Sequence, residues 1–384
     1  MRALVLAVLV LSTTLLGGCQ PTCAGAPLAP AAGARAAVLF ASDSYRAIAL
    51  YDASGAPLSD RWLDGTTPWT RQSASLAGGA GLAWGAPAGG LLLTLGDAPS
   101  PVVLFDVTSG QLVFDVPLET QAADALAIGS GVVATRGTEL VTIDPPTMRL
   151  DRTQAAPVDD ALGRLAPLGA SRLIAGTEGA GVIVASALGA NPTFVPLASF
   201  TGCAEVAALE PDPAAPAVLR AAVLCHGGAD PDPNLRRLAA GVILLEATEG
   251  GAPAPVRQVR SFGNAVPSGS LVALGGSFVA FRAGGSLELA VPDSIVFVDL
   301  ATGTSEQLAT ESWSLSWGAP LGGGDAVRAS TDGGASVELW WPSVSQGILR
   351  WRFDPAGTPL LTALAPATPP GCVRVPARAV RAIR

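Results

Sequence analysis

The residues able to do chemistry in this sequence are few. The 384 residues include five cysteines and one histidine, His226, and all 23 basic residues are arginines. The lack of lysine excludes P-loop nucleotide hydrolysis and Schiff-base catalysis, because both need a lysine amine. No C-x-x-C pair accompanies the single histidine, so the sequence predicts no zinc site.

The cysteines offer two candidate disulfides. Cys203 and Cys225 lie in neighbouring apolar runs that could face each other across an antiparallel strand pair. Cys23 lies near the amino end and Cys372 near the carboxyl end, so a bridge between them would clasp the two ends together. Besides Cys19, which is treated below, four cysteines remain, and they allow three pairings. We expect Cys203–Cys225 together with Cys23–Cys372, while free or differently paired thiols stay open.

The polar stretch after Cys225, H-G-G-A-D-P-D-P-N, has two alternative interpretations. A Ser-His-Asp site would have to use His226, but the chain has no G-x-S-x-G, so we interpret His226 as a surface-loop residue. Asp230, Asp232 and Asn234 have the spacing of a calcium loop, but Leu235 replaces the expected glycine and no acid ends the loop. We therefore expect a stiff exposed loop, and assign no catalytic residue, cofactor-binding residue or metal ligand.

The amino terminus carries a targeting signal. Arg2 precedes an apolar segment, residues 3–16, that is too short to span a bilayer comfortably. Leu16-Gly17-Gly18-Cys19 resembles the lipobox of bacterial lipoproteins. The resemblance implies a signal peptide over residues 1–18 and lipidation of Cys19, which would anchor the exported chain in the cell envelope. Gln20, in place of the Asp that often retains such proteins at the inner membrane, favours the outer membrane. An ordinary signal peptide and an uncleaved anchor remain the alternatives.

The amino-acid composition limits the fold class and the partners of the rest of the chain. With 49% hydrophobic and 14% charged residues, it is too apolar for disorder and can bury a large core. The net charge of −8 offers no basic stripe for phosphates, so we expect no nucleic-acid partner. Residues 19–35 are rich in proline and alanine and indicate a flexible tether. The 45 glycines and 32 prolines indicate frequent turns, which favours β structure from residue 36 onward.

A recurring hairpin predicts the architecture. Its clearest copy, residues 101–118, has two alternating apolar runs joined by a polar turn that ends in Gly110. Related units recur at intervals of roughly 40 to 60 residues. In each, an acid or serine can accept backbone N–H groups and a glycine can supply the positive φ of the turn. The turn-opening residues are Asp52, Asp106, Asp144, Ser186, Glu246, Asp299 and Asp354.

These repeats resemble β-propellers of the WD40-like and quinoprotein-like kind. The resemblance implies an all-β fold, a single β-propeller over residues 36–384, with seven blades of four-stranded antiparallel sheets and eight as the alternative. Two β-sandwich domains are the competing architecture. Of the eight tryptophans, we expect Trp62, Trp84, Trp317 and Trp351 to pack between blades rather than to line a groove. The termini would meet where the ring closes.

The expected function follows from the predicted fold and the predicted cellular location. We expect a non-enzymatic, lipid-anchored envelope protein that acts as a binding or assembly module, with a protein or a small extracytoplasmic ligand as partner and no cofactor. In layout it resembles the propeller lipoprotein of the outer-membrane β-barrel assembly machinery, although partner identity does not carry over. The alternative is a propeller enzyme, such as a lyase, a glycosidase or a quinoprotein. Acidic side chains converging at the central channel would favour the enzyme, and an apolar or tryptophan-lined face would favour binding.

Overall fold

The computed structural model describes most of the chain after residue 32. The described residues are 33–42, 45–58, 81–84, 90–94, 101–106, 111–117, 122–128, 131–144, 147, 149–260, 262, 266–284, 294–309, 323–328, 336–343, 347–357, 360–369 and 377–382. Among them, no helix is both long and apolar enough to cross a membrane.

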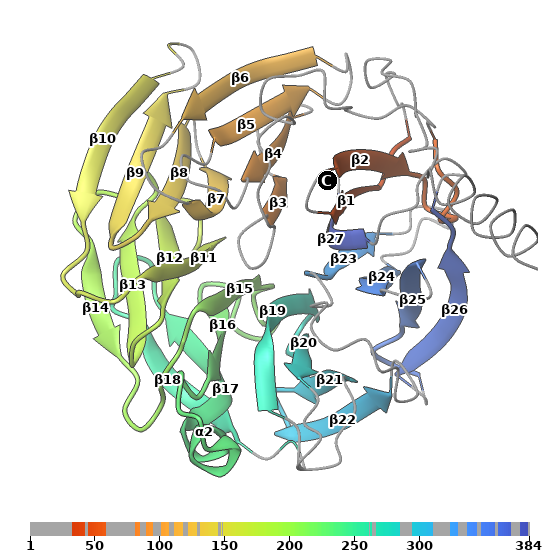
Figure 1. The fold of residues 1–384 in the computed structure, drawn as a ribbon. Coiled ribbons are helices and arrows are strands. Elements are labelled where there is room, and N and C mark those ends of the chain that lie inside the picture. Colours follow the sequence, from red (N-terminus) through yellow and green to blue (C-terminus); the bar gives the residue numbers. More distant parts are fainter. Residues whose placement is uncertain are drawn as a thin grey trace, which may run out of the picture.

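Six antiparallel sheets of four strands each are arranged around a ring (Figure 1). Each sheet is built from four strands that follow one another in the chain. The first three sheets are β3(Gly81–Trp84), β4(Gly90–Thr94), β5(Pro101–Asp106), β6(Gln111–Pro117); β7(Ala122–Ile128), β8(Gly131–Arg136), β9(Glu139–Asp144), β10(Arg149–Ala155); and β11(Leu162–Pro167), β12(Arg172–Thr177), β13(Gly181–Ser186), β14(Thr193–Pro196).

The other three sheets continue around the ring. They are β15(Glu205–Leu209), β16(Leu219–His226), β17(Ala240–Ala247), β18(Ala254–Val259); β19(Val266–Gly275), β20(Phe278–Gly284), β21(Ser294–Asp299), β22(Thr304–Ala309); and β23(Asp325–Arg328), β24(Val337–Ser343), β25(Gly347–Phe353), β26(Leu361–Ala367). One short helix, α2(Pro233–Ala239), lies between β16 and β17. The first strand of each sheet lies nearest the ring centre in Figure 1.

Strands from both ends of the described chain close the ring. β1(Ala36–Ser42) pairs on one side with β2(Tyr45–Tyr51) and on the other with β27(Ala377–Ala382), which forms a three-stranded sheet in the order β2-β1-β27. After β2 the chain turns back, and the Leu58 N–H donates to the Leu50 carbonyl oxygen at 2.8 Å. The expectation that the termini meet where the ring closes is therefore confirmed.

The blade count predicted from the sequence is wrong. The all-β fold and the single propeller are confirmed, but the structure has six four-stranded blades, not seven or eight. The first hairpin repeat, which begins at Ala47, belongs in the described residues to the three-stranded closing sheet. The turn motif marks only the end of a blade's third strand. Counting turns therefore counts sheets, and it does not establish that every sheet has four strands.

The hydrophobic core lies between adjacent blades. Middle strands such as β13, β17 and β21 are buried along almost their whole length because a neighbouring sheet covers each of their faces. The outer strands β10 and β18 are mostly exposed. β24 shows this packing in two adjacent residues, Trp340 and Trp341, both fully buried. Trp340 packs with Tyr51 of the closing sheet, and Trp341 packs in the layer that contains Phe297.

In the four-stranded sheets the predicted turns connect the third and fourth strands, while the Asp52 turn follows β2 of the closing sheet. Asp52 Oδ1 accepts the N–H groups of Ser54 (2.8 Å) and Ala56 (3.0 Å), and Asp299 Oδ1 accepts the Ala301 N–H at 2.8 Å. Burial tends to raise the pKa of Asp52 and of Asp299, but these hydrogen bonds outweigh it and hold both pKa values below the ordinary range. We call the side of the ring that carries these turns the Asp-turn face. Its described turns open at Asp52, Asp144, Ser186, Glu246, Asp299 and Asp354.

Candidate functional site

Ionisable side chains gather on the innermost strands, which makes the ring axis the first candidate site. We call this set the axial charge cluster: Asp124 on β7, Arg164 on β11, Glu205 on β15, Asp325 on β23 and Arg381 on β27. Each comes from a different sheet, so only the ring brings them together.

Arg164 lies between two carboxylates of the cluster. Its Nε is 3.5 Å from Asp124 Oδ2, and its Nη1 is 3.7 Å from Glu205 Oε2. Burial works against the charge of Arg164, but the attraction of Glu205, Asp124 and Asp325 outweighs it and raises the pKa of Arg164. Burial dominates at Asp124 and raises the pKa of that carboxyl, against the opposing effects of Arg164 and of backbone N–H groups.

Each acid of the cluster also binds the backbone of the following sheet. Asp124 Oδ2 accepts the Leu165 N–H at 3.0 Å, and Glu205 Oε2 accepts the Leu271 N–H at 3.2 Å. Asp325 Oδ2 accepts the Ala382 N–H at 3.0 Å. In each pair the donor lies on the innermost strand of the next sheet in the ring. The three carboxylates therefore join neighbouring sheets around the axis.

Acidic side chains therefore do converge at the axis, which is the arrangement expected of the enzyme alternative, but their contacts limit what the acids can do chemically. A glycosidase or lyase needs one carboxyl group poised to deliver a proton and another free to attack or to accept one. Here all three carboxylates accept backbone N–H groups, and two of them also pair with Arg164. Asp124 Oδ1 is a buried oxygen without a hydrogen-bond partner in the described part of the chain. The axial charge cluster is thus mainly occupied in holding sheets together.

Sequence reasoning missed the axial charge cluster, although a signal was present. A polar residue that follows a small one opens the first strand of successive units, as in Ala123-Asp124, Gly163-Arg164, Ala204-Glu205 and Gly324-Asp325. An alignment of the repeats on the turn after the third strand hides this register, because the spacing between the first strand and that turn varies from unit to unit.

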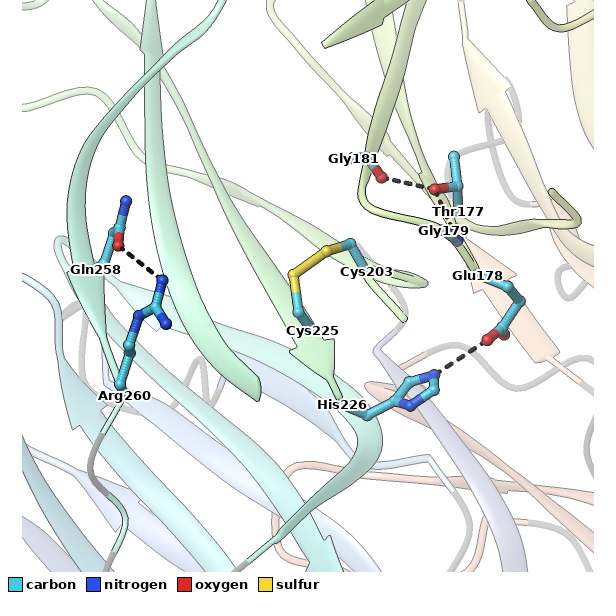
Figure 2. The surroundings of a disulfide bond; sticks show 9 residues. All are labelled: Thr177, Glu178, Gly179, Gly181, Cys203, Cys225, His226, Gln258 and Arg260. Atoms are coloured by element: carbon cyan, nitrogen blue, oxygen red, sulfur yellow. Dashed lines mark hydrogen bonds and ion pairs between the residues drawn. A yellow bond between two sulfur atoms is a disulfide. The ribbon is translucent and has the colours of Figure 1, made fainter. Parts of the chain in front are cut away.

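Cys203 and Cys225 form a disulfide (Figure 2). Cys225 lies on β16, and Cys203 lies just before β15, the strand that pairs with β16. Both cysteines are fully buried. The Cys203 carbonyl oxygen also accepts the Thr177 N–H of the preceding blade at 3.1 Å. Cys19, Cys23 and Cys372 lie outside the described residues.

His226 lies beside this disulfide and contacts the preceding blade. Its Nε2 is 3.1 Å from Glu178 Oε2, on the turn between β12 and β13, and Figure 2 shows the two side chains facing each other. The hydrogen bond with Glu178 raises the pKa of His226 and lowers the pKa of Glu178, in both cases against the effect of burial. His226 is therefore an interblade contact at the end of a strand, not a loop residue.

The expected stiff loop at Asp230 to Asn234 is also wrong in part. Asp232 caps helix α2 by accepting the Asn234 N–H at 2.8 Å, with Pro233 in the first turn. Asp230 Oδ1 accepts the Asp232 N–H at 2.8 Å. The alternating prolines fit the start of a helix as well as a loop. Leu235 and Leu238 on α2 are exposed.

Solved structures share the fold of this chain at low sequence identity. The β-propeller domain of Cps50 (Swd1) from Myceliophteria thermophila aligns with a TM-score of 0.52 and 12% identity, covering 83% of this chain and 97% of its own. Hydrazine synthase from Kuenenia stuttgartiensis aligns with a TM-score of 0.50 and 11% identity, covering 75% of this chain and 80% of its own. No protein-family model matches the sequence, and no curated protein matches it either. At these identities the likeness establishes a β-propeller fold alone.

Proposed function

We propose that this protein is a non-enzymatic binding or assembly module, anchored by lipid in the bacterial envelope. The observation that carries the proposal is the use of the axial acids. Asp124, Glu205 and Asp325 each accept a backbone N–H from the following sheet, so the groups that a propeller enzyme would place at its axis join the blades instead. A ring whose described axial acids hold neighbouring sheets together is suited to presenting its faces to a partner.

The proposed cellular location rests on the amino-terminal sequence. Residues 1–18 would be the signal peptide, Cys19 the lipidated residue and residues 19–35 the tether. The disulfide between Cys203 and Cys225 suits an oxidising compartment outside the cytoplasm. We place the protein at the outer membrane rather than the inner one because Gln20 follows the lipobox cysteine.

Metabolic labelling and cell fractionation test the proposed lipidation and the proposed membrane location. Cells that express the wild-type chain or Cys19→Ala would be grown with an alkyne-bearing fatty acid and separated into soluble, inner-membrane and outer-membrane fractions. We expect label in the wild-type protein and its recovery with the outer membrane. We expect no label in Cys19→Ala. Equal labelling of the two proteins, or recovery of the wild-type chain in the soluble fraction, would contradict the proposal.

Crosslinking in intact cells tests the binding role. The tagged wild-type protein would be crosslinked, recovered from solubilised envelopes and compared with a tagged, lipid-anchored protein of unrelated fold. A partner captured by the propeller and absent from the control is expected. Purified protein would also be assayed against polysaccharide and glycoside substrates. Turnover that Asp124→Asn abolishes without unfolding the protein would overturn the non-enzymatic reading.

A further inference from the structure

Helix α2 carries two apolar side chains that the fold leaves in solvent. Leu235 is 50% exposed and Leu238 is 70% exposed, and α2 has no buried residue. The two leucines are three residues apart, so they share one face of the helix. A seven-residue helix is barely stable by itself, and helices in proteins gain most of their stability by burying an apolar face. The fold therefore leaves exposed the face that would normally stabilise α2.

Arginine side chains surround the two leucines. Arg236 and Arg237 flank the leucine face, because each is about 100° around the helix from one of the leucines. The exposed Arg260 donates from Nη1 to the Leu238 carbonyl oxygen at 3.2 Å, which places a third guanidinium group beside the same leucine. We call Leu235, Leu238, Arg236, Arg237 and Arg260 the α2 patch. It is an apolar and basic surface on a chain whose net charge is −8.

The charge pattern decides which surface can cover the patch. Asp230 and Asp232 lie at the amino end of α2 and accept backbone N–H groups there, so the positive charge is concentrated in the last turn, beside Leu238. A second copy of the chain would bring the same arginines against one another, and this repulsion disfavours it. An anionic bilayer complements both parts of the patch. Leucine side chains enter the boundary between head groups and acyl chains, and arginine side chains reach the phosphates.

We propose that the α2 patch binds the surface of an anionic phospholipid membrane. α2 lies at the outer edge of the ring, where a flat surface can approach it (Figure 1). Two inserted leucines and three arginines give weak affinity alone, so the contact adds to another attachment and orients the ring on the bilayer.

This inference rests on the proposed function, because the lipid at Cys19 would hold the patch near a bilayer. The chain enters β1 on the Asp-turn face, since Ala36 pairs with Tyr51, and α2 lies on the opposite side of the ring, before the start of β17. The eight residues of β17 separate these two sides by about 26 Å. The tether, residues 19–35, would span about 55 Å when extended. Its length therefore allows α2 to reach the bilayer.

Vesicle flotation tests the patch without the lipid anchor. The full mature chain with Cys19→Ala would be mixed with vesicles of phosphatidylethanolamine that contain about 30% phosphatidylglycerol, or with neutral vesicles of phosphatidylcholine. The patch variant adds Leu235→Ser/Leu238→Ser. Its matched control adds Leu150→Ser/Leu188→Ser, which replaces two leucines that are exposed on other sheets. Thermal unfolding of each protein reports whether it is folded.

We expect the Cys19→Ala chain to bind the anionic vesicles at lipid concentrations on the order of 1 mM. Leu235→Ser/Leu238→Ser should weaken this binding about tenfold, and neutral vesicles should bind about tenfold less. Leu150→Ser/Leu188→Ser should leave binding unchanged. No binding, equal binding to neutral vesicles, or an equal loss in the two leucine variants would overturn the inference. These outcomes leave the proposed function standing, because lipidation of Cys19 and partner capture are measured separately, by labelling and by crosslinking.

Discussion

The guanidinium group of Arg350 donates a hydrogen bond to the backbone carbonyl oxygen of Ser54, which lies 296 residues earlier in the chain. A second nitrogen of Arg350 donates to the Ala53 carbonyl oxygen at 3.1 Å. Both carbonyl groups belong to the turn after β2, so Arg350 joins the last blade to the closing sheet. The same guanidinium pairs with Glu338 at 2.7 Å and lies over the Trp340 ring.

Replacing Arg350 with methionine should destabilise the propeller strongly. The Glu338 side chain is only 3% exposed and would be left as a buried carboxylate without its main cation, which costs roughly 3–5 kcal/mol in the free energy of unfolding. Urea unfolding at neutral pH measures this loss. Arg352→Met is the matched control, because Arg352 is 57% exposed and reaches Glu338 only at 3.8 Å. We expect that variant to lose less than about 1 kcal/mol, and equal losses would contradict the closure role of Arg350.

The turns could be predicted because their physics is local. Asp52 and Asp299 bind backbone N–H groups two to four residues ahead, so their role is contained in a short stretch of sequence. Gly303 follows Asp299 with a φ of +79°, as the pattern required. The Cys203–Cys225 pair could be predicted for a similar reason, because its two apolar runs are neighbours in the chain.

The interblade contacts could not be predicted because they join distant parts of the chain. Nothing near Arg350 in the sequence indicates that it binds the turn at Ser54. The pairing of Asp124 with Arg164 likewise depends on how two sheets are rotated about the ring axis. The closing sheet combines β1 with β27 from the opposite end of the chain, so its strand number follows from ring closure and not from any single repeat.

Asp299→Ala should cost about 1 kcal/mol in the free energy of unfolding. The carboxylate accepts the Ala301 N–H at 2.8 Å and the hydroxyl groups of Ser277 and Thr302 at 2.7 Å, all of which would lose this acceptor. Chemical denaturation compares the variant with Glu306→Ala, an exposed acid on the next strand, which should be close to neutral. A smaller loss for Asp299→Ala than for Glu306→Ala would show that the turn does not depend on its acid.

Removing the Cys203–Cys225 disulfide should lower the stability by about 3 kcal/mol. The bridge spans 22 residues, and the cost follows from the extra freedom that its loss gives to the unfolded chain. The double variant Cys203→Ala/Cys225→Ala would be compared with the wild type by denaturant unfolding. The matching control is Cys23→Ala/Cys372→Ala, which removes the other expected bridge. Peptide mapping without reductant should recover Cys203 linked to Cys225, whereas a Cys23–Cys203 peptide would contradict both pairings.

The His226–Glu178 pair should make stability depend on pH. The pKa of His226 is raised above 6.5, so its contribution is complete below that pH and is lost as the pH rises through the folded-state value. The pKa of Glu178 is lowered below 4.5, so its contribution is present above that pH and is lost as the pH falls through the folded-state value. The pair therefore stabilises the fold most between these two ordinary values.

His226→Gln should accordingly lose more stability at a pH of about 5.5 than at about 8.5, because the contribution of the charged imidazole is lost as the pH rises. The pH-dependent part should stay below about 1 kcal/mol, because the Glu178 side chain is 53% exposed and solvent screens the pair. Glu178→Gln should remove the same pH-dependent part and spare the contact of the His226 ring with Gly202. Thermal unfolding of both variants at the two pH values measures the difference. An equal loss at both pH values would assign the effect of His226 to packing against Gly202 and not to its charge.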